Sequence, residues 1–457
     1  MGFEYFQRIL IIFEEKKEMA VKITVHRGTD RIGGTITEIA TENTHIFIDF
    51  GASLSDTDGK DSDDKMVNII NSAVQAGKCD AIFFTHFHGD HIGLLDRLPE
   101  KDILNGAIQL GMGANARKGL KIIHKTLVKF SGNEKHRNIL KILNYGKWAD
   151  FVDLEPNTVS FTINDDIAVT PISVDHSAFD SYMFIIEAEG KCIVHTGDFR
   201  THGRLGKGFF ERLARHLDDK SVDVLLTEGT MLSRLSAKLL TEEQMEQKAF
   251  EELNKPENKC AFLVCSSTNV ESLASFHNAA MKLHRPFIVN GYVYEQLKLY
   301  RKTVGKSDKR LTFRKSYPFA PMGEYNPKLE MTQPEYMKKN GFVMMIGTND
   351  RYTERTEYFR EENPLLIYSM WGGYLDKDNP AYNPKLRELY DKWPRHLDLH
   401  TSGHAYKEDI EEMIRRVCPS KAIIPIHTEK KEMFPQLDIG QLSRLVKPAG
   451  DGDVYVI

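Results

Sequence analysis

The chain has 457 residues, of which 41% are hydrophobic and 28% are charged, and its formal net charge at pH 7 is -4. These values are typical of a folded globular protein of two to three domains, and they exclude a disordered or fibrous chain. The weak negative charge also excludes a general attraction to nucleic acid, so a polyanionic substrate would need local basic patches.

The first 20 residues differ from the rest of the chain. An apolar run at 9–13 is followed by glutamates rather than by the small-residue cleavage site of a secretory signal. We therefore interpret 1–20 as a short N-terminal extension, or as sequence that precedes a translation start at Met19. The fold is expected to begin at Val21.

Short strand-like segments separated by glycine come next. Lys22 to His26 alternates between polar and apolar residues, and the segments 35–40 and 45–50 are predicted to pair as a hairpin. The apolar segment 81–85 predicts a buried strand. Polar residues that directly follow such a strand lie on a loop that the sheet holds in place and solvent can reach.

The residues after this strand form the densest group of metal-binding side chains in the sequence: His86, His88, Asp90 and His91. Imidazole nitrogens and carboxylate oxygens are zinc ligands. Four such ligands on one tight loop cannot all reach a single tetrahedral ion, but His86 and His88 can face one metal while Asp90 and His91 face another. Gly89 is expected to let the backbone turn where a side chain would obstruct it. The sequence therefore predicts a two-metal site.

Helix-like and strand-like segments then alternate up to Glu228. Residues 115–148 are predicted to be helical and are rich in lysine and arginine. Strands are predicted at 167–174, 182–187, 192–196 and 222–227. Two of these strands end in metal-binding side chains, because His176 follows the first and Asp198, which could bridge two ions, follows the third.

After Glu228 the sequence changes in character. The segment Ser233 to Asn254 is charged and predicted to be helical. A βαβ-type alternation follows and predicts a parallel sheet, with strands at 261–265, 286–290, 342–346 and 365–368 and a helix at 271–283. Past Asn383 we expect a helix, a strand ending near His400, a helix at 407–417, and a strand at 422–426 that ends in His427.

Together these motifs resemble the metallo-β-lactamase superfamily from Val21 onwards. The segments Thr401-Ser402-Gly403-His404-Ala405 and Ile424-Pro425-Ile426-His427 look like the closing motifs of the β-CASP nucleases, in particular the ribonuclease J group. Glu228 stands where that family carries an acidic residue just before its inserted domain. The resemblance implies an α/β fold, a metallo-β-lactamase αββα sandwich with an inserted β-CASP α/β domain. Its parts would be an N-terminal extension (1–20), a first part of the sandwich (21–230), the inserted domain (231–385) and a closing part (386–457).

The resemblance also implies the ligands of two zinc ions per chain. His86, His88 and His176 would bind one ion, Asp90, His91 and His427 the other, and Asp198 both. His195 is adjacent to the turn that carries Asp198 and is expected to support it.

Such a site is suited to hydrolysis of a phosphodiester. Two zinc ions ~3.5–4 Å apart can hold a shared water and lower its pKa to ~7. Our hypothesis is that the bridging hydroxide attacks phosphorus while His404 stabilises the transition state or protonates the leaving 3′-oxygen. The resemblance implies that Glu228 hydrogen-bonds His404, so Asp90, His404 and Glu228 are the predicted catalytic residues. Alternatively, His404 only packs beside a helix cap formed by Ser402 or Gly403.

Two basic segments, 115–148 and 298–315, favour a polyanionic substrate. Tyr300, Phe313 and Tyr317 lie within or next to the second segment, and nucleic-acid bases could stack on them. Solvated helix faces would explain either basic segment as well.

Six residues are candidates for substrate binding: Ser266, Ser267, Thr268, Ser369, Ser402 and Gly403. The first three could hold a phosphate together with the amides of a helix N-terminus, but helix capping explains them equally well. Ser369 lies in the segment 368–374, which fits the 5′-monophosphate-binding element of the ribonuclease J group only at Ser369 and the glycines.

We therefore predict a zinc-dependent ribonuclease, acting on single-stranded RNA as an exonuclease, an endonuclease or both. A hydrolase of a small ester, thioester or lactone is an alternative that would not need His404 with Glu228 or a second α/β domain. A DNA-directed nuclease is another alternative. A metal-free binding scaffold is disfavoured because all seven ligands are present, and self-association is left open.

The cysteines and the hydropathy of the chain bear on its location. The five cysteines are scattered without a CxxC pair, which predicts buried free thiols and a reducing, cytoplasmic compartment. No apolar run approaches the ~20 residues that span a bilayer, so no membrane contact is expected.

Overall fold

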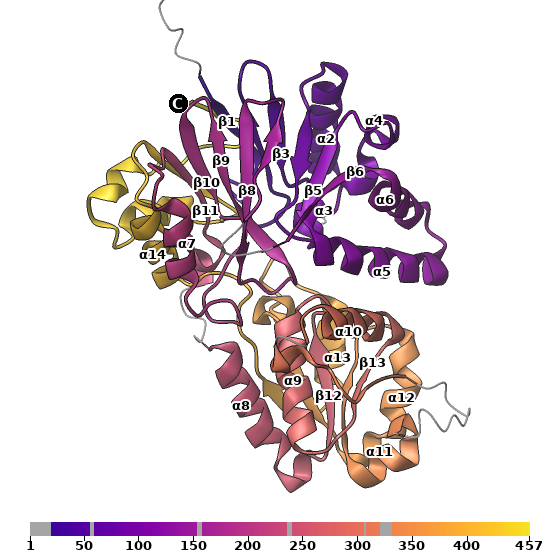
Figure 1. Cartoon of the computed structure of the whole chain (residues 1–457). Coiled ribbons are helices and arrows are strands. Elements are labelled where there is room, and N and C mark those ends of the chain that lie inside the picture. Colours follow the sequence, from indigo (N-terminus) through magenta and orange to yellow (C-terminus); the bar gives the residue numbers. More distant parts are fainter. Residues whose placement is uncertain (1–19, 55–58, 153–157, 235–239, 306–307, 320–330) are drawn as a thin grey trace, which may run out of the picture.

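The computed structural model describes residues 20–54, 59–152, 158–234, 240–305, 308–319 and 331–457. Three β-sheets organise this part of the chain (Figure 1). The predicted N-terminal extension lies almost wholly outside the described residues, which begin at Ala20.

The first sheet has seven strands in the order β19-β1-β2-β3-β4-β5-β6. The predicted hairpin is confirmed, because β2 and β3 pair antiparallel, and β3 to β6 run parallel. The last strand, β19, returns to pair antiparallel with β1. The strands are β1 (Lys22–Arg27), β2 (Ile36–Ala40), β3 (His45–Ile48), β4 (Ala81–Phe83), β5 (Gln109–Gly113), β6 (Lys147–Phe151) and β19 (Val454–Val456).

The second sheet has six strands in the order β18-β11-β10-β9-β8-β7. Its two parallel pairings join β10 to β11 and β11 to β18. The closing strand β18 therefore lies beside β11, which precedes it by about two hundred residues in the sequence. The strands are β7 (Phe161–Ile163), β8 (Ile167–Val174), β9 (Ser181–Ala188), β10 (Lys191–His195), β11 (Val224–Glu228) and β18 (Ala422–Ile426).

These two sheets pack face to face with helices on their outer sides (Figure 1). Buried Phe83 of the first sheet and Phe184 and Leu226 of the second belong to one apolar cluster. The helices are α2 (Gly59–Gln75), α4 (Glu100–Leu104), α5 (Ala114–Ser131) and α6 (Glu134–Tyr145) beside the first sheet, and α7 (Phe209–Leu217) and α14 (Lys407–Val417) beside the second. The predicted αββα sandwich is confirmed.

The third sheet is entirely parallel, with strand order β14-β13-β15-β12-β16-β17. It confirms the predicted βαβ alternation after Glu228. Its strands are β12 (Cys260–Cys265), β13 (Phe287–Val289), β14 (Ser316–Pro318), β15 (Phe342–Met345), β16 (Leu365–Ser369) and β17 (His396–Asp398). The domain limits at 231 and 385 stay a prediction, and β17 of this sheet follows residue 385.

Helices cover both faces of the third sheet. Residues of α8 and α9 pack with Leu263 in one apolar cluster, whereas Phe262 packs with Phe359 and Trp393 in another on the opposite face. The helices are α8 (Glu242–Leu253), α9 (Val270–Lys282), α10 (Gly291–Thr303), α11 (Pro334–Asn340), α12 (Thr353–Tyr358) and α13 (Pro384–Asp391).

Two predicted helices have different limits. The helix expected at Ser233 to Asn254 is α8, which begins only at Glu242 because Thr241 and Gln244 form a capping box there; residues 235–239 lie outside the described part. The segment 115–148 is divided into α5 and α6 at Gly132, whose φ of 63° caps α5 in the left-handed region.

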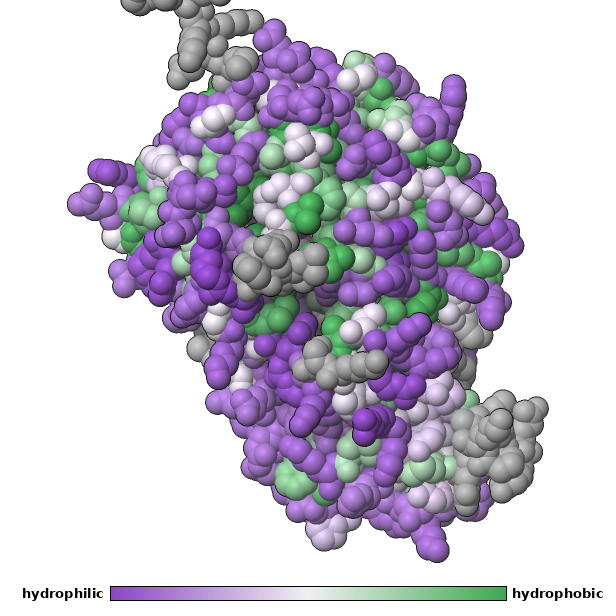
Figure 2. Space-filling view, in the orientation of Figure 1, coloured by the Kyte–Doolittle hydropathy of each residue, from purple (hydrophilic) through white to green (hydrophobic). Residues whose placement is uncertain are grey.

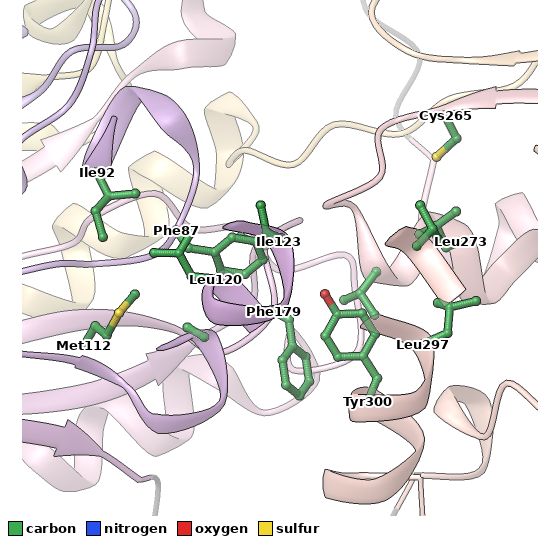
Figure 3. Packing of buried hydrophobic residues seen from close by; sticks show 14 of the residues in the cluster. Phe87, Ile92, Met112, Leu120, Ile123, Phe179, Cys265, Leu273, Leu297 and Tyr300 are labelled. Carbon is green, nitrogen blue, oxygen red and sulfur yellow. The ribbon is translucent and has the colours of Figure 1, made fainter. Parts of the chain in front are cut away.

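The sandwich and the third sheet share a continuous apolar cluster. Phe179, in the loop between β8 and β9, faces Tyr300 of α10 with ring centroids 4.6 Å apart (Figure 3). Tyr300 and Phe313 are both buried. The expectation that these two rings stack on nucleic-acid bases was therefore wrong, because they belong to the core that joins the two parts.

Most of the cysteines are buried, and the surface visible in Figure 2 is mostly hydrophilic. Four thiols are buried as predicted, but Cys418 is exposed because it ends α14 in the left-handed conformation. Burial raises the pKa of the Cys79 thiol to about 12. In the described ranges no helix combines the length and the apolarity that crossing a membrane requires. Hydrophilic side chains dominate the face of the molecule drawn in Figure 2.

Candidate metal centre

The predicted metal ligands all lie where strands of the two packed sheets end. His86 and His88 follow β4, and the short helix α3 (Gly89–Ile92) carries Asp90 and His91. His176 follows β8, Asp198 follows β10 and His427 follows β18. Rigid strands therefore deliver ligands from distant parts of the sequence to one edge of the sandwich.

One group of donor atoms combines His86, His88 and His176, whose ligand atoms lie within 4.8 Å of one another. His176 Nε2 is 3.3 Å from His88 Nδ1. This is the first triad expected from the sequence.

A second group combines Asp90, His91 and His427, again within 4.8 Å. His427 Nε2 is 3.3 Å from Asp90 Oδ2. The Oδ2 atom of Asp198 lies between the two groups, 3.1 Å from His91 Nε2 and 3.8 Å from His86 Nε2. The structure thus brings all seven predicted ligands together, with Asp198 beside both triads.

Buried atoms without partners indicate that the two groups fit metal ions. His86 Nε2 and Asp198 Oδ1 have no hydrogen-bond partner among the described residues although both are buried. Leaving buried polar atoms unpaired is costly. Convergent imidazole nitrogens and carboxylate oxygens are also the donor set that zinc prefers, so the residues present suit two zinc ions.

The protonation states of the first triad agree with ligation. Burial holds the pKa of His86 and of His176 well below the ordinary value, and it lowers the pKa of His88 to about 4. These imidazoles are therefore neutral, the form that binds metal. Burial would raise the pKa of Asp198, but neighbouring His427 and His91 outweigh it and hold that pKa well below its usual range.

The ligand rings are oriented by partners on their other nitrogens. His91 Nδ1 is 2.7 Å from the buried Asp49 carboxylate, and His427 Nδ1 is 2.8 Å from Thr230 Oγ1. His176 Nδ1 donates to the Gly403 carbonyl at 2.6 Å. Such contacts fix the ring and the tautomer of a metal-binding histidine. Asp49 and Thr230 were missed in the sequence, and their only local signal was a position at or just past the end of a β-type segment.

Gly89 and His195 were both expected to support the centre, and the structure gives them different outcomes. Gly89 begins α3 and a Cβ there would meet nothing within 4 Å, so the expected obstruction at this position was wrong. His195 Nδ1 accepts a hydrogen bond from the Gly197 amide at 3.1 Å. That contact braces the turn that presents Asp198.

His404 and Glu228 form a pair at the edge of the metal ligands. His404 Nδ1 is 3.1 Å from Glu228 Oε2 and 3.6 Å from Asp198 Oδ2. Glu228 is buried and also accepts a hydrogen bond from the Phe199 amide at 2.8 Å. Burial would lower the pKa of His404, but the charges of Glu228 and Asp198 outweigh it and raise that pKa. The pair can therefore hold a proton beside the metal groups.

The candidate substrate-binding residues lie on two different loops. Ser266, Ser267 and Thr268 follow β12, where Ser266 Oγ is 3.0 Å from Thr268 Oγ1 and the neighbouring Asn269 caps α9. Ser369 ends the adjacent strand β16, pairs with Cys265 and has a buried hydroxyl without a hydrogen-bond partner among the described residues. Their binding of substrate stays a prediction.

Ser402 and Gly403 lie in the loop that carries His404. The Ser402 hydroxyl accepts from the His404 amide at 3.0 Å. A Cβ at Gly403 would lie 2.4 Å from Ser177 Oγ, so only glycine lets this loop approach His176. The two residues therefore position ring atoms of the centre.

The two predicted basic segments meet at one place. Helices α5 and α10 pack against each other, and a groove beside them is lined by apolar side chains, four basic ones and Glu295, which pairs with Lys298. The lining residues that matter here are Ile122, Lys298, Arg301, Lys302 and Arg314.

Comparisons with known proteins agree with this architecture. Residues 29–111 match the metallo-beta-lactamase superfamily, and residues 397–434 match the Zn-dependent metallo-hydrolase RNA specificity domain. In these two segments the chain is similar to zinc-dependent hydrolases of the metallo-β-lactamase superfamily, and the αββα sandwich agrees with that likeness.

Two ribonucleases J are similar in sequence to most of this chain. One, from Helicobacter pylori (strain B128), is 24% identical over 425 residues, which cover 90% of this chain and 56% of that protein. Another, from Mycoplasma pneumoniae, is 21% identical over 442 residues, covering 92% of this chain and 70% of that protein. The chain thus resembles the ribonucleases J, and it spans little more than half the length of the Helicobacter relative.

A solved structure shares the whole fold. The crystal structure of a protein of unknown function from Enterococcus faecalis V583 superposes with a TM-score of 0.68 at 19% identity. The superposition covers 96% of this chain and 100% of that one.

Proposed function

We propose that this chain is a zinc-dependent phosphodiesterase that cleaves RNA. The observation that carries the proposal is the His404–Glu228 pair beside two triads of metal ligands, with His404 Nδ1 3.6 Å from Asp198. A site that only bound metal for structural reasons would have no use for a buried acid–histidine pair at its edge.

Seven residues would hold two zinc ions: His86, His88 and His176 one ion, Asp90, His91 and His427 the other, and Asp198 both. When bound, two zinc ions supply an activated water and neutralise charge that develops on phosphate oxygens. Asp49, Thr230 and Gly403 keep the ligand rings in the orientation that binding requires.

His404 is the proposed general acid. Glu228 keeps the imidazole protonated and oriented through Nδ1, which leaves Nε2 to donate a proton to the leaving 3′-oxygen. The Phe199 amide fixes the Glu228 carboxylate, so the pair is rigid before substrate arrives. The departing alcohol is poor as an anion, and protonation removes that barrier.

RNA is the proposed substrate for two reasons. The relatives above are ribonucleases J, and the match to an RNA specificity domain spans the loop of Ser402, Gly403 and His404. The basic groove beside α5 and α10 could attract a phosphate backbone. The free cysteines agree with a reducing, cytoplasmic compartment.

The test is hydrolysis by the zinc-loaded protein of RNA and DNA of matched sequence, each with a 5′-phosphate or a 5′-hydroxyl. Cleavage of RNA that stops with a chelator and returns with zinc supports the proposal. Product ladders separate stepwise from internal cleavage. Preference for DNA would move the assignment to a DNA-directed nuclease, and hydrolysis of small esters without nucleic-acid cleavage would refute it.

A further inference from the structure

An arginine lies next to the metal centre and has no assigned role. The 3-10 turn η2 (Thr230–Arg234) follows β11 and ends in Arg234. Its first residue, Thr230, contacts His427 Nδ1, and Met231 Sδ accepts a hydrogen bond from the Ser402 hydroxyl at 3.1 Å. The turn is therefore anchored to both flanks of the centre.

The guanidinium of Arg234 lacks an anionic partner. Within the described ranges it forms no ion pair, and its buried Nε has no hydrogen-bond partner. Arg200 makes the contrast, because it is buried among the carboxylates of Asp175, Glu242 and Glu271. Arg234 is half-buried, and burial outweighs the more distant charges of Glu429 and Glu228 and lowers its pKa. A half-buried guanidinium without an ion pair is open to an anionic ligand.

Trp371, from the segment that follows β16, holds the guanidinium in place. The Arg234 Cζ lies 3.7 Å from the centroid of the Trp371 ring. Gly373 allows this packing, since a Cβ there would lie 2.4 Å from that ring. A guanidinium stacked on an aromatic face keeps the N–H groups of its edge free for a planar, two-pronged contact with a phosphate or carboxylate.

The stacked pair is packed against the segment that follows β16. The Tyr374 ring meets the Trp371 ring edge-on, with centroids 5.5 Å apart.

We propose that Arg234, held by Trp371, binds a phosphate group of the substrate directly beside the metal centre. The proposal rests on the proposed function and names the anion that the stacked guanidinium would bind. The phosphate could be a terminal monophosphate or a phosphodiester within the strand, since both present the same oxygens to a guanidinium.

The test measures binding of single-stranded RNA with phosphorothioate linkages, which resist hydrolysis, to the wild-type chain and three variants. Arg234→Gln should weaken binding about 10-fold or more and reduce the slope of log K against log salt by about 0.7. Arg234→Lys should keep the slope but weaken binding, because an ammonium cannot make the two-pronged contact. Arg360→Gln removes an exposed charge paired with Glu357 and should change neither value.

Comparison of 5′-phosphate with 5′-hydroxyl RNA separates the two sources of phosphate. If Arg234 binds a terminal phosphate, Arg234→Gln abolishes the difference between the two RNAs; if it binds an internal one, both weaken equally. Trp371→Phe provides a second probe, with intermediate loss expected, and thermal melting shows that each variant is folded.

Two outcomes distinguish a failure of the Arg234 inference from a failure of the proposed function. If wild-type protein cleaves RNA while Arg234→Gln and Arg234→Lys bind with unchanged affinity and salt slope, the Arg234 site is refuted and the function stands. If wild-type protein neither binds nor cleaves RNA, the next measurement is calorimetry with inorganic phosphate. Phosphate binding that is lost in Arg234→Gln would keep the Arg234 site and refute the proposed function. Absence of phosphate binding by the wild type would refute both.

Discussion

Three rings of the metal-ligand groups, those of His91, His176 and His427, are held by a hydrogen bond at the far nitrogen. The Gly403 carbonyl accepts from His176 Nδ1 at 2.6 Å, and it can do so only because residue 403 has no side chain. The identity of a residue that touches no metal therefore decides where a ligand points.

Replacing Gly403 by alanine should lower zinc affinity about 10- to 100-fold, because the added Cβ would push the loop away from Ser177 and His176. Zinc content after dialysis against buffered free zinc measures the effect. Gly291→Ala is the matched control, since a Cβ there meets nothing within 4 Å. Unchanged zinc content in Gly403→Ala would contradict this account of the loop.

A second prediction at this scale concerns His404 and Glu228. His404→Ala should lower kcat for RNA about 100-fold or more with zinc content unchanged, as expected for loss of a general acid. Glu228→Gln should cost less, and the double variant should be no slower than His404→Ala, because the two residues act through one proton. Activity of His404→Ala within twofold of wild type would show that the histidine only packs.

The convergence of the seven ligands could be predicted because each lies in a segment that follows a strand, and local apolar patterning predicts those strands. Their partners could not. Asp49 and Thr230 are ordinary polar residues until the fold places them against His91 and His427, and nothing local marks such long-range contacts.

Among the elements, the pair α5 and α6 contains a buried histidine contact. His124 Nδ1 is 3.0 Å from His136 Nδ1, and burial together with the charges of His136 and Lys135 lowers the pKa of His124 to about 4. In the sequence His124 lies within the basic segment 115–148, and that pattern predicts only a basic helix face.

Acidification should weaken this helix pair. The unfolded chain protonates His124 near the ordinary value of ~6.5, whereas the folded chain does so only near 4, so the unfolded state binds more protons between these values. Stability is therefore complete above pH ~6.5 and falls by up to about 1.4 kcal/mol per pH unit towards pH 4. Urea unfolding of wild type and His124→Gln across this range measures the difference, with exposed His284→Asn as control. Parallel pH profiles for wild type and His124→Gln would contradict it.

Elements with simple patterns were predicted closely, as β8, α14 and β18 show. Failures occurred where short-range chemistry or distant pairing decides. Capping by Thr241 delayed α8, Gly132 divided α5 from α6, and β19 exists only because β1 offers it an open edge.

At the scale of the whole molecule, Arg200 links the sandwich to the third sheet. Its guanidinium contacts Asp175, which precedes His176, as well as Glu242 of α8 and Glu271 of α9, and it donates to the Ser402 carbonyl. Burial raises the pKa of Glu271 to about 7, although the positive charge of Arg200 opposes this shift. Three carboxylates around one cation make this junction sensitive to loss of the arginine.

Arg200→Gln should destabilise the protein by about 3–5 kcal/mol, because it leaves buried carboxylates without a cation. The midpoint of urea unfolding measures this. Arg97→Gln, which removes an exposed ion pair with Asp64, should cost no more than about 1 kcal/mol. Equal midpoints for the two variants would refute a stabilising role for the buried cluster.

The parallel pairing of β11 with β18 has a consequence for synthesis of the protein. Translation delivers the first triad by residue 176, but His427 leaves the ribosome only after the whole third sheet has been made. A nascent chain can therefore assemble one half of the centre early and must wait for the other. A copy whose translation stops before residue 427 would lack this ligand, so under the proposed function it could not cleave the message from which it is being translated.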